Sequence, residues 1–264
     1  MQLTLPESTR NGLRALRFQA ALFDRFRGFD RSLRRLAASP EAALSIDAAI
    51  ELYAHWGDPL SQSDESYLRS CLAEATRTRG AIVQCGASLL TLILGRICST
   101  VQPGARQLWC LEDDPHWANV VRSWLTQYRI GAAHVITSRA HLFDGFVWYA
   151  VDPERLAQGI RLVFCEGGRA TPGGVIGTLS RLKSRLAADA TILARKVTRD
   201  GDLKALDAWA QAHGAACVVV DRKEGFVKLR CGAGRAGTDR RAVQSPASSS
   251  SQSTTSRSRK LRSP

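Results

Sequence analysis

Short apolar runs of four or five residues alternate with segments of helix length from Gly80 onward. Because these runs carry few charged residues, we expect each to be a strand that is buried on both faces. Strands that alternate with helices predict a parallel sheet with helices packed on both sides. The predicted strands are 81–85, 107–111, 133–137, 161–165, 190–193, 216–220 and 226–229, and the predicted helices are 89–99, 115–128, 174–187 and 202–213.

The last two predicted strands are joined by only five residues, 221–225. This link is too short for a crossover helix, so we expect the two strands to form an antiparallel hairpin. The predicted fold class is therefore α/β, with a Rossmann-like, doubly wound, mostly parallel seven-stranded sheet that closes with a C-terminal antiparallel hairpin.

The two ends of the chain differ from this central pattern. Residues 1–60 are predicted to be a helical extension, in which apolar residues recur mostly at three-residue steps between arginines: Leu13, Leu16, Phe23, Phe26, Leu33 and Leu36. A basic amphipathic helix of this kind either covers the main domain or binds a membrane surface or partner. Residues 232–264 are rich in Ser, Thr, Gly and Arg, which predicts a disordered basic tail. The main domain is expected to span residues 61–231.

The net charge of +13 belongs mostly to these two ends. Residues 232–264 carry a charge of +6 and residues 1–39 carry +5, which leaves about +2 for the middle of the chain. A nearly neutral central domain is unlike the surface of a nucleic-acid-binding domain. The basic ends are therefore the candidate segments for contact with nucleic acid or another anionic surface. The sequence does not predict the oligomeric state.

Seven cysteines occur without any pair at the C-x-x-C spacing. An odd number without this spacing argues against a disulfide framework and against zinc, so no metal ligands are predicted. The sequence has no apolar run of the roughly 18 residues that a membrane span needs, and its first residues do not resemble a secretory signal. We expect a cytoplasmic protein.

The first predicted strand ends in a turn that contains a glycine. Residues 84–88, Gln-Cys-Gly-Ala-Ser, lead directly into the helix predicted from Leu89. Glycine lets the backbone approach a ligand closely, and the N-terminus of a helix offers N–H groups that lack partners within the helix. A tight turn without a ligand explains the same residues, so this turn alone does not identify a binding site.

An acidic cluster, Glu112-Asp113-Asp114, follows the second predicted strand and precedes Pro115. A carboxylate at the tip of this strand can accept hydrogen bonds from the hydroxyls of a ribose. Helix capping explains the same cluster, because Asp114 suits an N-cap with Pro115 at the first helical position. The two interpretations are compatible, with Glu112 as the binding residue and Asp114 as the cap.

Residues 56–229 resemble a bacterial group of class I S-adenosylmethionine (SAM)-dependent methyltransferases. Segment 84–91, QCGASLLT, is similar to the ECGSGLST motif of this group, and segment 111–117, LEDDPHW, is similar to LEHDPxW. Segment 148–150, WYA, is similar to a WYD element. Two further segments, CEGG at 165–168 and TPGGVIG at 171–177, resemble CDGPP and TPGGRYG.

The resemblance implies SAM as the cofactor and assigns roles by position. The methionine portion of SAM would be held by Gln84, Gly86, Ser88 and Thr91, the ribose by Glu112, and the adenine end by Asp113 and Ser138. Glu166, after the fourth strand, would orient the acceptor or take its proton. The implied activity is transfer of the SAM methyl group to an oxygen or nitrogen nucleophile of a small-molecule acceptor.

The sequence departs from the pattern of the group at several of these positions. Gln84 replaces a carboxylate, Ser88 replaces a glycine, and Arg195 and Lys196 stand where two aspartates are usual. Either the acceptor is anionic and is bound by Arg195, Lys196 and Arg199, or the site has decayed to a methyltransferase-like binding module. A nicotinamide-dependent oxidoreductase would require a fuller G-x-G-x-x-G than the one glycine of this turn.

Overall fold

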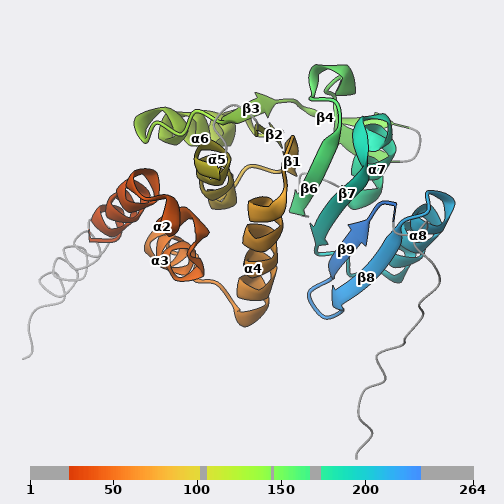
Figure 1. Cartoon of the computed structure of the whole chain (residues 1–264), viewed down its shortest axis with the longest axis horizontal. Coiled ribbons are helices and arrows are strands. Elements are labelled where there is room, and N and C mark those ends of the chain that lie inside the picture. Colours follow the sequence, from red (N-terminus) through yellow and green to blue (C-terminus); the bar gives the residue numbers. More distant parts are fainter. Residues whose placement is uncertain (1–23, 102–105, 144–145, 167–173, 233–264) are drawn as a thin grey trace, which may run out of the picture.

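The computed structural model describes residues 24–101, 106–143, 146–166 and 174–232. Its centre is a seven-stranded sheet with the order β3-β2-β1-β6-β7-β9-β8 (Figure 1). Strands β3, β2, β1, β6 and β7 are parallel, whereas β9 is antiparallel to both of its neighbours. The predicted fold class is confirmed, including the closing hairpin. The strands of the sheet are β1 (Ile82–Cys85), β2 (Leu108–Glu112), β3 (Ala133–Thr137), β6 (Ile160–Glu166), β7 (Leu186–Arg195), β8 (Ala216–Asp221) and β9 (Phe226–Arg230).

Helices cover both faces of the sheet because successive strand residues point to opposite sides. Ile82 and Leu108 belong to the hydrophobic cluster under α4, α5 and α6, whereas Val83 and Leu111 belong to the cluster under α7 and α8. Each face of the central strands is therefore buried against its own helical layer. The edge strands β3 and β8 contain no buried residue, contrary to the prediction that each run is buried on both faces. The helices are α2 (Pro40–Leu44), α3 (Ile46–Trp56), α4 (Gln62–Arg77), α5 (Leu89–Val101), α6 (Pro115–Gln127), α7 (Gly174–Leu182) and α8 (Asp200–Ala212).

Two boundaries differ by more than two residues from the sequence predictions. The helix predicted to reach residue 187 ends at Leu182, and β7 begins at Leu186 rather than at residue 190. The Ala-rich stretch at the start of β7 has no β-branched residues, so its pairing with β6 is set by the tertiary structure and not by propensity. A two-stranded sheet was also missed, β4 (Ala140–Phe143) with β5 (Phe146–Tyr149). No helix separates β5 from β3, so its apolar run does not fit the strand–helix alternation from which the other strands were predicted.

The N-terminal residues that the structure describes form a helical layer against α5 and α6. Residues 24–38 are helical, followed by α2 and α3. Phe29, Leu33 and Leu36 are buried, so this face packs on the main domain as a cover, whereas Phe26 is 69% exposed. Leu13, Leu16 and Phe23 lie outside the described residues, as does the predicted tail from residue 233 onward. Within the described ranges, no helix has the length and apolar character required to cross a membrane.

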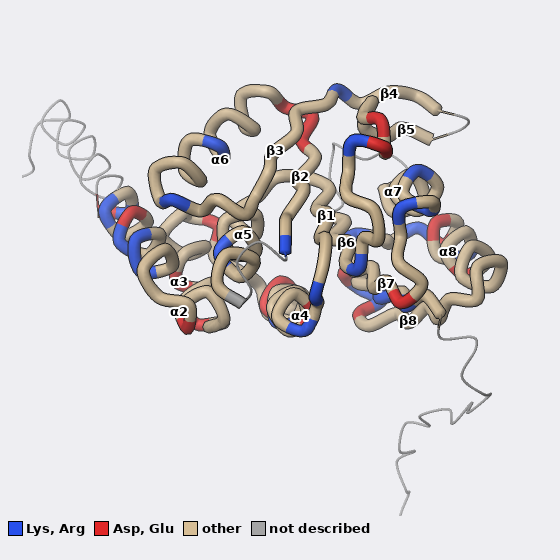
Figure 2. Tube along the Cα trace, turned by 45° about the horizontal axis from the view of Figure 1, so that its top comes forward, with Lys and Arg blue, Asp and Glu red and all other residues tan. Residues whose placement is uncertain are grey.

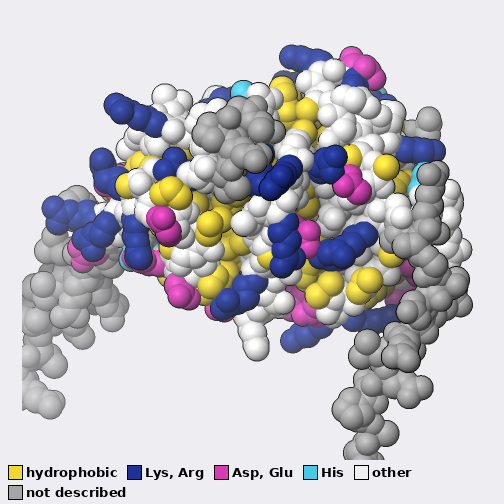
Figure 3. Space-filling model, in the orientation of Figure 1, with side chains coloured by type: hydrophobic (Ala, Val, Ile, Leu, Met, Phe, Trp, Pro, Cys, Tyr) yellow, Lys and Arg dark blue, Asp and Glu magenta, His cyan; other side chains and the backbone are white. Residues whose placement is uncertain are grey.

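Acidic and basic residues are both present on the described surface. Acidic and basic side chains lie beside one another on the face seen in Figure 3. A group of Lys and Arg positions occurs on the helix of residues 24–38, at the side of α2 and α3 in Figure 2. This arrangement agrees with a central domain whose charge is close to neutral.

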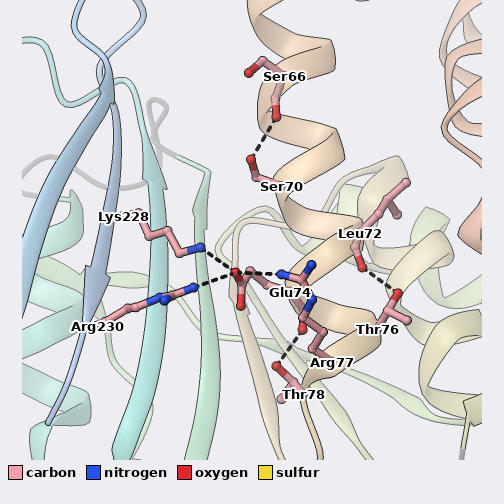
Figure 4. A network of polar contacts seen from close by, with 9 residues as sticks. All are labelled: Ser66, Ser70, Leu72, Glu74, Thr76, Arg77, Thr78, Lys228 and Arg230. Atoms are coloured by element: carbon pink, nitrogen blue, oxygen red, sulfur yellow. Dashed lines mark hydrogen bonds and ion pairs between the residues drawn. The ribbon is translucent and has the colours of Figure 1, made fainter. Parts of the chain in front are cut away.

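A buried glutamate joins α4 to the C-terminal hairpin (Figure 4). Glu74 is 8% exposed, and its Oε1 lies 2.5 Å from Lys228 Nζ and 3.4 Å from Arg230 Nη2 on β9. Arg77 Nη1 on the next turn of α4 lies 4.0 Å away. Lys228 and Arg230 thus hold α4 against β9 through this buried carboxylate, while Arg77 adds a third positive charge from α4 itself.

Gly225→Ala is expected to lower the free energy of unfolding by about 2 kcal/mol. Gly225 has a φ of 64°, and a Cβ atom there would lie 2.4 Å from the backbone nitrogen of Val197. The clash involves main-chain atoms, which cannot rotate away. Chemical denaturation of both proteins measures the effect, and Gly201→Ala is a control because a Cβ at Gly201 meets nothing within 4 Å. Equal stabilities of the Gly225→Ala and parent proteins would contradict the structure of this turn.

Candidate functional site

The carboxyl ends of the parallel strands meet at one edge of the sheet, and the predicted site residues lie there. Gly86 follows β1, Glu112 ends β2, and Ser138 follows β3. Glu166 ends β6 and is paired in register with Arg195, the last residue of β7. Since β2 and β6 flank β1 on opposite sides, the strand order reverses beside β1. Doubly wound folds bind ligands in the crevice at such a reversal.

The turn after β1 is closed by its own hydrogen bonds. Gly86 has a φ of 94°, which suits glycine, and its N–H donates to the carbonyl oxygen of Leu111 at 2.8 Å. Ser88 N–H donates to Thr91 Oγ1 at 3.0 Å, and Leu90 N–H donates to Ser88 Oγ at 3.2 Å. The side chains of Ser88 and Thr91 thus cap the N-terminus of α5. An anionic group that bound these N–H groups would have to displace the caps.

The carboxylate of Glu112 joins this turn to the start of α6. Its Oε2 accepts from the Ala87 N–H at 2.7 Å, and its Oε1 accepts from the Asp114 N–H at 2.9 Å. The residue is only 5% exposed. Burial raises the pKa of Glu112 and the nearby Asp113 raises it further, while the two backbone donors oppose this shift. Each carboxylate oxygen retains capacity to accept one more hydrogen bond.

Two buried polar atoms near this turn have no hydrogen-bond partner among the described residues. Gln84 is completely buried, and its Nε2 donates to Ser88 Oγ at 3.2 Å while its Oε1 is unpaired. The hydroxyl of Tyr149 on β5 is also buried and unpaired. Burial raises the pKa of Tyr149, and Cys85 and Glu112 contribute to the shift. Tyr149 belongs to the same hydrophobic cluster as Cys85 at the end of β1 and Leu111 on β2. Because buried polar atoms are normally paired, both are candidates for contact with a polar ligand.

Asp114 caps a helix, whereas Asp113 and Ser138 remain candidate ligand-binding residues. Asp114 is the N-cap of α6, and its carboxylate accepts from two N–H groups of the first turn at 2.8 and 3.2 Å. The capping interpretation of Asp114 is therefore confirmed. Asp113 is half-buried next to Glu112. Ser138, also half-buried, donates its N–H to the carbonyl oxygen of Glu112 at 2.8 Å, which holds the turn after β3 beside β2.

The three predicted acceptor-binding cations differ in how they are held. Arg195 Nη2 lies 2.7 Å from Asp64 Oδ1, and its guanidinium lies 5.2 Å from the centroid of the Tyr67 ring. Since both partners belong to α4, Arg195 fastens this helix over the end of β7. Lys196 and Arg199 are exposed. Lys196 has a φ of 62°, a left-handed conformation that is uncommon for a residue with a side chain.

The segment after β6 is described only at its ends. Glu166 closes the strand, and α7 begins at Gly174. Gly167, Gly168 and the motif residues 171–173 lie outside the described residues. The predicted catalytic role of Glu166 thus depends on its place at the end of β6.

Two residues of this region, Trp117 and Tyr149, were not predicted as site residues. Trp117 donates its indole Nε1–H to the carbonyl oxygen of Ala87 at 2.7 Å. Tyr149 brings the unpaired hydroxyl described above. Both residues belong to segments that resemble family motifs, but their spacing along the chain does not reveal which atoms they contact.

No disulfide joins the seven cysteines, all of which the structure describes. Among the described residues, no group of three or more His, Cys, Asp or Glu side chains is placed to hold a metal ion.

Comparison with known proteins gives no sequence relatives. No protein-family model matches the chain, and no curated protein matches it.

Solved structures with a similar arrangement include several methyltransferases. A putative O-methyltransferase from Klebsiella pneumoniae is 17% identical with a TM-score of 0.46, over 70% of this chain and 88% of that one. An O-methyltransferase from Bacillus cereus in complex with SAH is 12% identical with a TM-score of 0.47, over 70% and 90%. The O-methyltransferase TomG from Streptomyces achromogenes, in complex with SAM, is 14% identical with a TM-score of 0.47, over 70% and 88%. The fold assignment rests on the strand order of this chain itself.

Proposed function

We propose that the chain binds SAM at the carboxyl ends of β1, β2 and β3 and transfers its methyl group to an oxygen or nitrogen nucleophile. The observation that carries this proposal is the buried carboxylate of Glu112, which lies at the tip of β2 and is bonded to the turn after β1. A carboxylate in this place accepts hydrogen bonds from ribose hydroxyls. The antiparallel β9 between β7 and β8, and a turn with one glycine, favour methyl transfer over hydride transfer from nicotinamide.

The residues around the turn have the chemistry that SAM requires. Gly86 leaves space for close approach of the ligand, and Ser88 and Thr91 line the start of α5. The unpaired amide oxygen of Gln84 can accept a hydrogen bond from the ammonium group of the methionine portion. Asp113 and Ser138 are the proposed contacts of the adenine end, because they follow the tips of β2 and β3. The unpaired hydroxyl of Tyr149 adds a further polar group near the same strand ends.

SAM bound here would supply a methyl group that is already activated by its positively charged sulfur. The protein then has to align the methyl group with the acceptor and exclude water from the reacting atoms. Glu166, at the end of β6, is the proposed group that orients the acceptor or takes its proton.

The proposed acceptor carries a negative charge. Lys196 and Arg199 are exposed near the end of β7. A planar anion suits the guanidinium of Arg199, and Lys196 adds a positive point charge. Arg195 contributes less directly, because its guanidinium is already paired with Asp64.

A binding module without catalytic activity is the second candidate. It is favoured by the turn after β1, where the side chains of Ser88, Thr91 and Glu112 already satisfy N–H groups that a ligand would use. Such a module would bind a partner through the methyltransferase-like fold and would catalyse no reaction.

Calorimetric titration with SAM, and separately with its demethylated product, decides between the two candidates. Binding in the micromolar range supports the enzyme and justifies a screen of anionic acceptors. No heat of binding up to millimolar ligand would contradict the enzyme and leave the binding module.

Gln84→Glu is expected to tighten SAM binding by about 3- to 10-fold and to lower the melting temperature of the ligand-free protein. A carboxylate would pair with the ammonium group of SAM, which a neutral amide contacts more weakly. The same carboxylate is completely buried, so its desolvation costs stability when no ligand is bound. Calorimetry and thermal denaturation measure the two effects, with Gln84→Met as the control that lacks both polar atoms. Unchanged or weaker SAM binding by Gln84→Glu would contradict the placement of the methionine portion at this residue.

A further inference from the structure

Two hydrogen bonds fix the backbone on both sides of the Ala87 Cα atom. Its N–H donates to Glu112 Oε2 at 2.7 Å, and its carbonyl oxygen accepts from Trp117 Nε1–H at 2.7 Å. The first bond fixes the peptide before Ala87 and the second fixes the peptide after it. The peptide that leads to Ser88 is held at its carbonyl oxygen by the indole and at its N–H by Thr91 Oγ1. Loss of the indole donor removes one of these two anchors and weakens the backbone support of the Ala87–Glu112 bond.

The indole of Trp117 is itself held by an aromatic cluster of four rings: Phe29, Trp56, Trp117 and Trp124. Trp117 packs edge-on against Trp124 with ring centroids 5.6 Å apart, and its ring lies 6.0 Å from that of Trp56. Phe29 lies 5.1 Å from Trp56 and 5.2 Å from Trp124. Edge-on and tilted contacts at these distances are favourable and directional, so they define the orientation of each ring.

This aromatic cluster belongs half to the N-terminal helices and half to α6. Phe29 lies in the helix of residues 24–38 and Trp56 ends α3, whereas Trp117 and Trp124 lie on α6. A hydrogen bond of 2.7 Å from Tyr128 Oη to Asp30 Oδ1 joins the end of α6 to the same N-terminal helix. The N-terminal layer thus fixes the helix whose first turn carries Trp117.

We infer that Trp117 is a positioning residue for the cofactor turn, and that the N-terminal helices act on the proposed SAM site through it. The expected effect of this positioning on SAM affinity rests on the proposed function. The N-terminal helical layer is therefore a functional part of the site. It fixes the orientation of the indole, and the indole fixes the backbone of Ala87. This backbone in turn orients the Glu112 carboxylate.

The test compares Trp117→Phe with Trp124→Phe in the full chain. Both substitutions keep an aromatic ring in the cluster, but only the first removes a hydrogen bond to the turn. Loss of one hydrogen bond from an ordered turn corresponds to about 3- to 10-fold weaker SAM binding. We expect this loss in Trp117→Phe, and less than a 2-fold change in Trp124→Phe.

Hydrogen–deuterium exchange without ligand measures the positioning itself, independently of SAM. The peptide covering residues 85–90 is expected to exchange faster in Trp117→Phe than in the parent protein or in Trp124→Phe. Trp56→Leu tests the N-terminal layer, because it removes the ring of α3 that packs against Trp117 at a position that is 41% exposed. The same peptide is expected to exchange faster.

The SAM titration and the exchange measurement together distinguish failure of the inference from failure of the proposed function. Unchanged exchange of this peptide in Trp117→Phe overturns the positioning role, whatever the SAM titration shows. Faster exchange with SAM affinity equal to that of the parent protein overturns the link to the cofactor site. Absence of SAM binding by the parent protein overturns the proposed function and with it that link, whereas the exchange comparison still decides whether Trp117 holds the turn.

Discussion

Glu112→Ala protein is expected to bind SAM at least about 100-fold more weakly than the parent protein, because charge-assisted hydrogen bonds to both ribose hydroxyls disappear together. The substitution also leaves the N–H groups of Ala87 and Asp114 without their acceptor. The turn after β1 and the start of α6 then lose the group that joins them. Isothermal calorimetry measures the loss of affinity, and circular dichroism verifies that the variant remains folded.

Two variants control for the structural part of this effect. Glu112→Gln keeps the shape and one of the two acceptor oxygens, while its NH2 group faces the other backbone donor. We expect a folded, less stable protein whose SAM affinity falls because the carboxylate charge is gone. Asp114→Asn alters the nearby acid that caps α6, keeps a side chain that can cap the helix, and should change affinity much less. An Asp114→Asn protein that loses binding while Glu112→Gln retains it would contradict the assignment of the ribose to Glu112.

The pH dependence of SAM affinity gives a further check on the same residue. Burial, with a contribution from Asp113, raises the pKa of Glu112 in the folded protein. A raised carboxyl pKa means that the ionised form costs stability, so this contribution favours folding below the unfolded-state pKa and is lost as pH rises through the folded pKa. The ligand requires the ionised form. SAM affinity is therefore expected to increase as pH rises through this raised pKa, while Glu112→Gln shows no such step.

The sequence predicted the sheet because the apolar runs are physically unambiguous. Strands buried on both faces need near-continuous apolar residues, and the runs that became β1, β2 and β6 have them. The edge strands β3 and β8 have no buried residue, so for these two runs the expectation of burial on both faces was wrong. The closing hairpin followed from chain length alone, since five residues cannot hold a crossover helix. The start of β7 was missed because an Ala-rich segment has no strand preference, and the pairing of Ile160 with Leu186 decides its conformation.

Candidate site positions followed from the same logic, but their contacts did not. Residues at the carboxyl ends of parallel strands must lie near one another, which brought Gly86, Glu112 and Ser138 to one edge. Whether a side chain is available to a ligand depends on partners that are distant in the sequence. Arg195 was expected to bind an acceptor, yet it is paired with Asp64, 131 residues earlier in the chain. The hydrogen bond from Trp117 to Ala87 also depends on the packing of two helices, which no local pattern specifies.

Glu74→Ala is expected to lower the free energy of unfolding at neutral pH by about 3 kcal/mol, since removal of one partner from a buried ion pair leaves the other uncompensated. Glu74 is 8% exposed, whereas the side chains of Lys228 and Arg230 are 22% and 57% exposed. Lys228 is therefore the cation that loses most, while solvent screens Arg230. Urea denaturation measures the change, and Glu51→Ala is a matched control in which an exposed pair with Arg35 is lost, at a cost below about 1 kcal/mol.

The acid side of the stability profile tests the same contact by a second route. Burial acts to raise the pKa of Glu74, but the hydrogen bond and charge of Lys228, together with Arg230, outweigh it and hold the pKa below its usual value. A lowered carboxyl pKa contributes stability that is present above the unfolded-state pKa and is lost as pH falls through the folded pKa. The difference in stability between the parent protein and Glu74→Ala should therefore shrink as pH falls below about 4.5. A difference that stays constant down to pH 3 would mean that lost packing, rather than the charge of Glu74, holds α4 on β9.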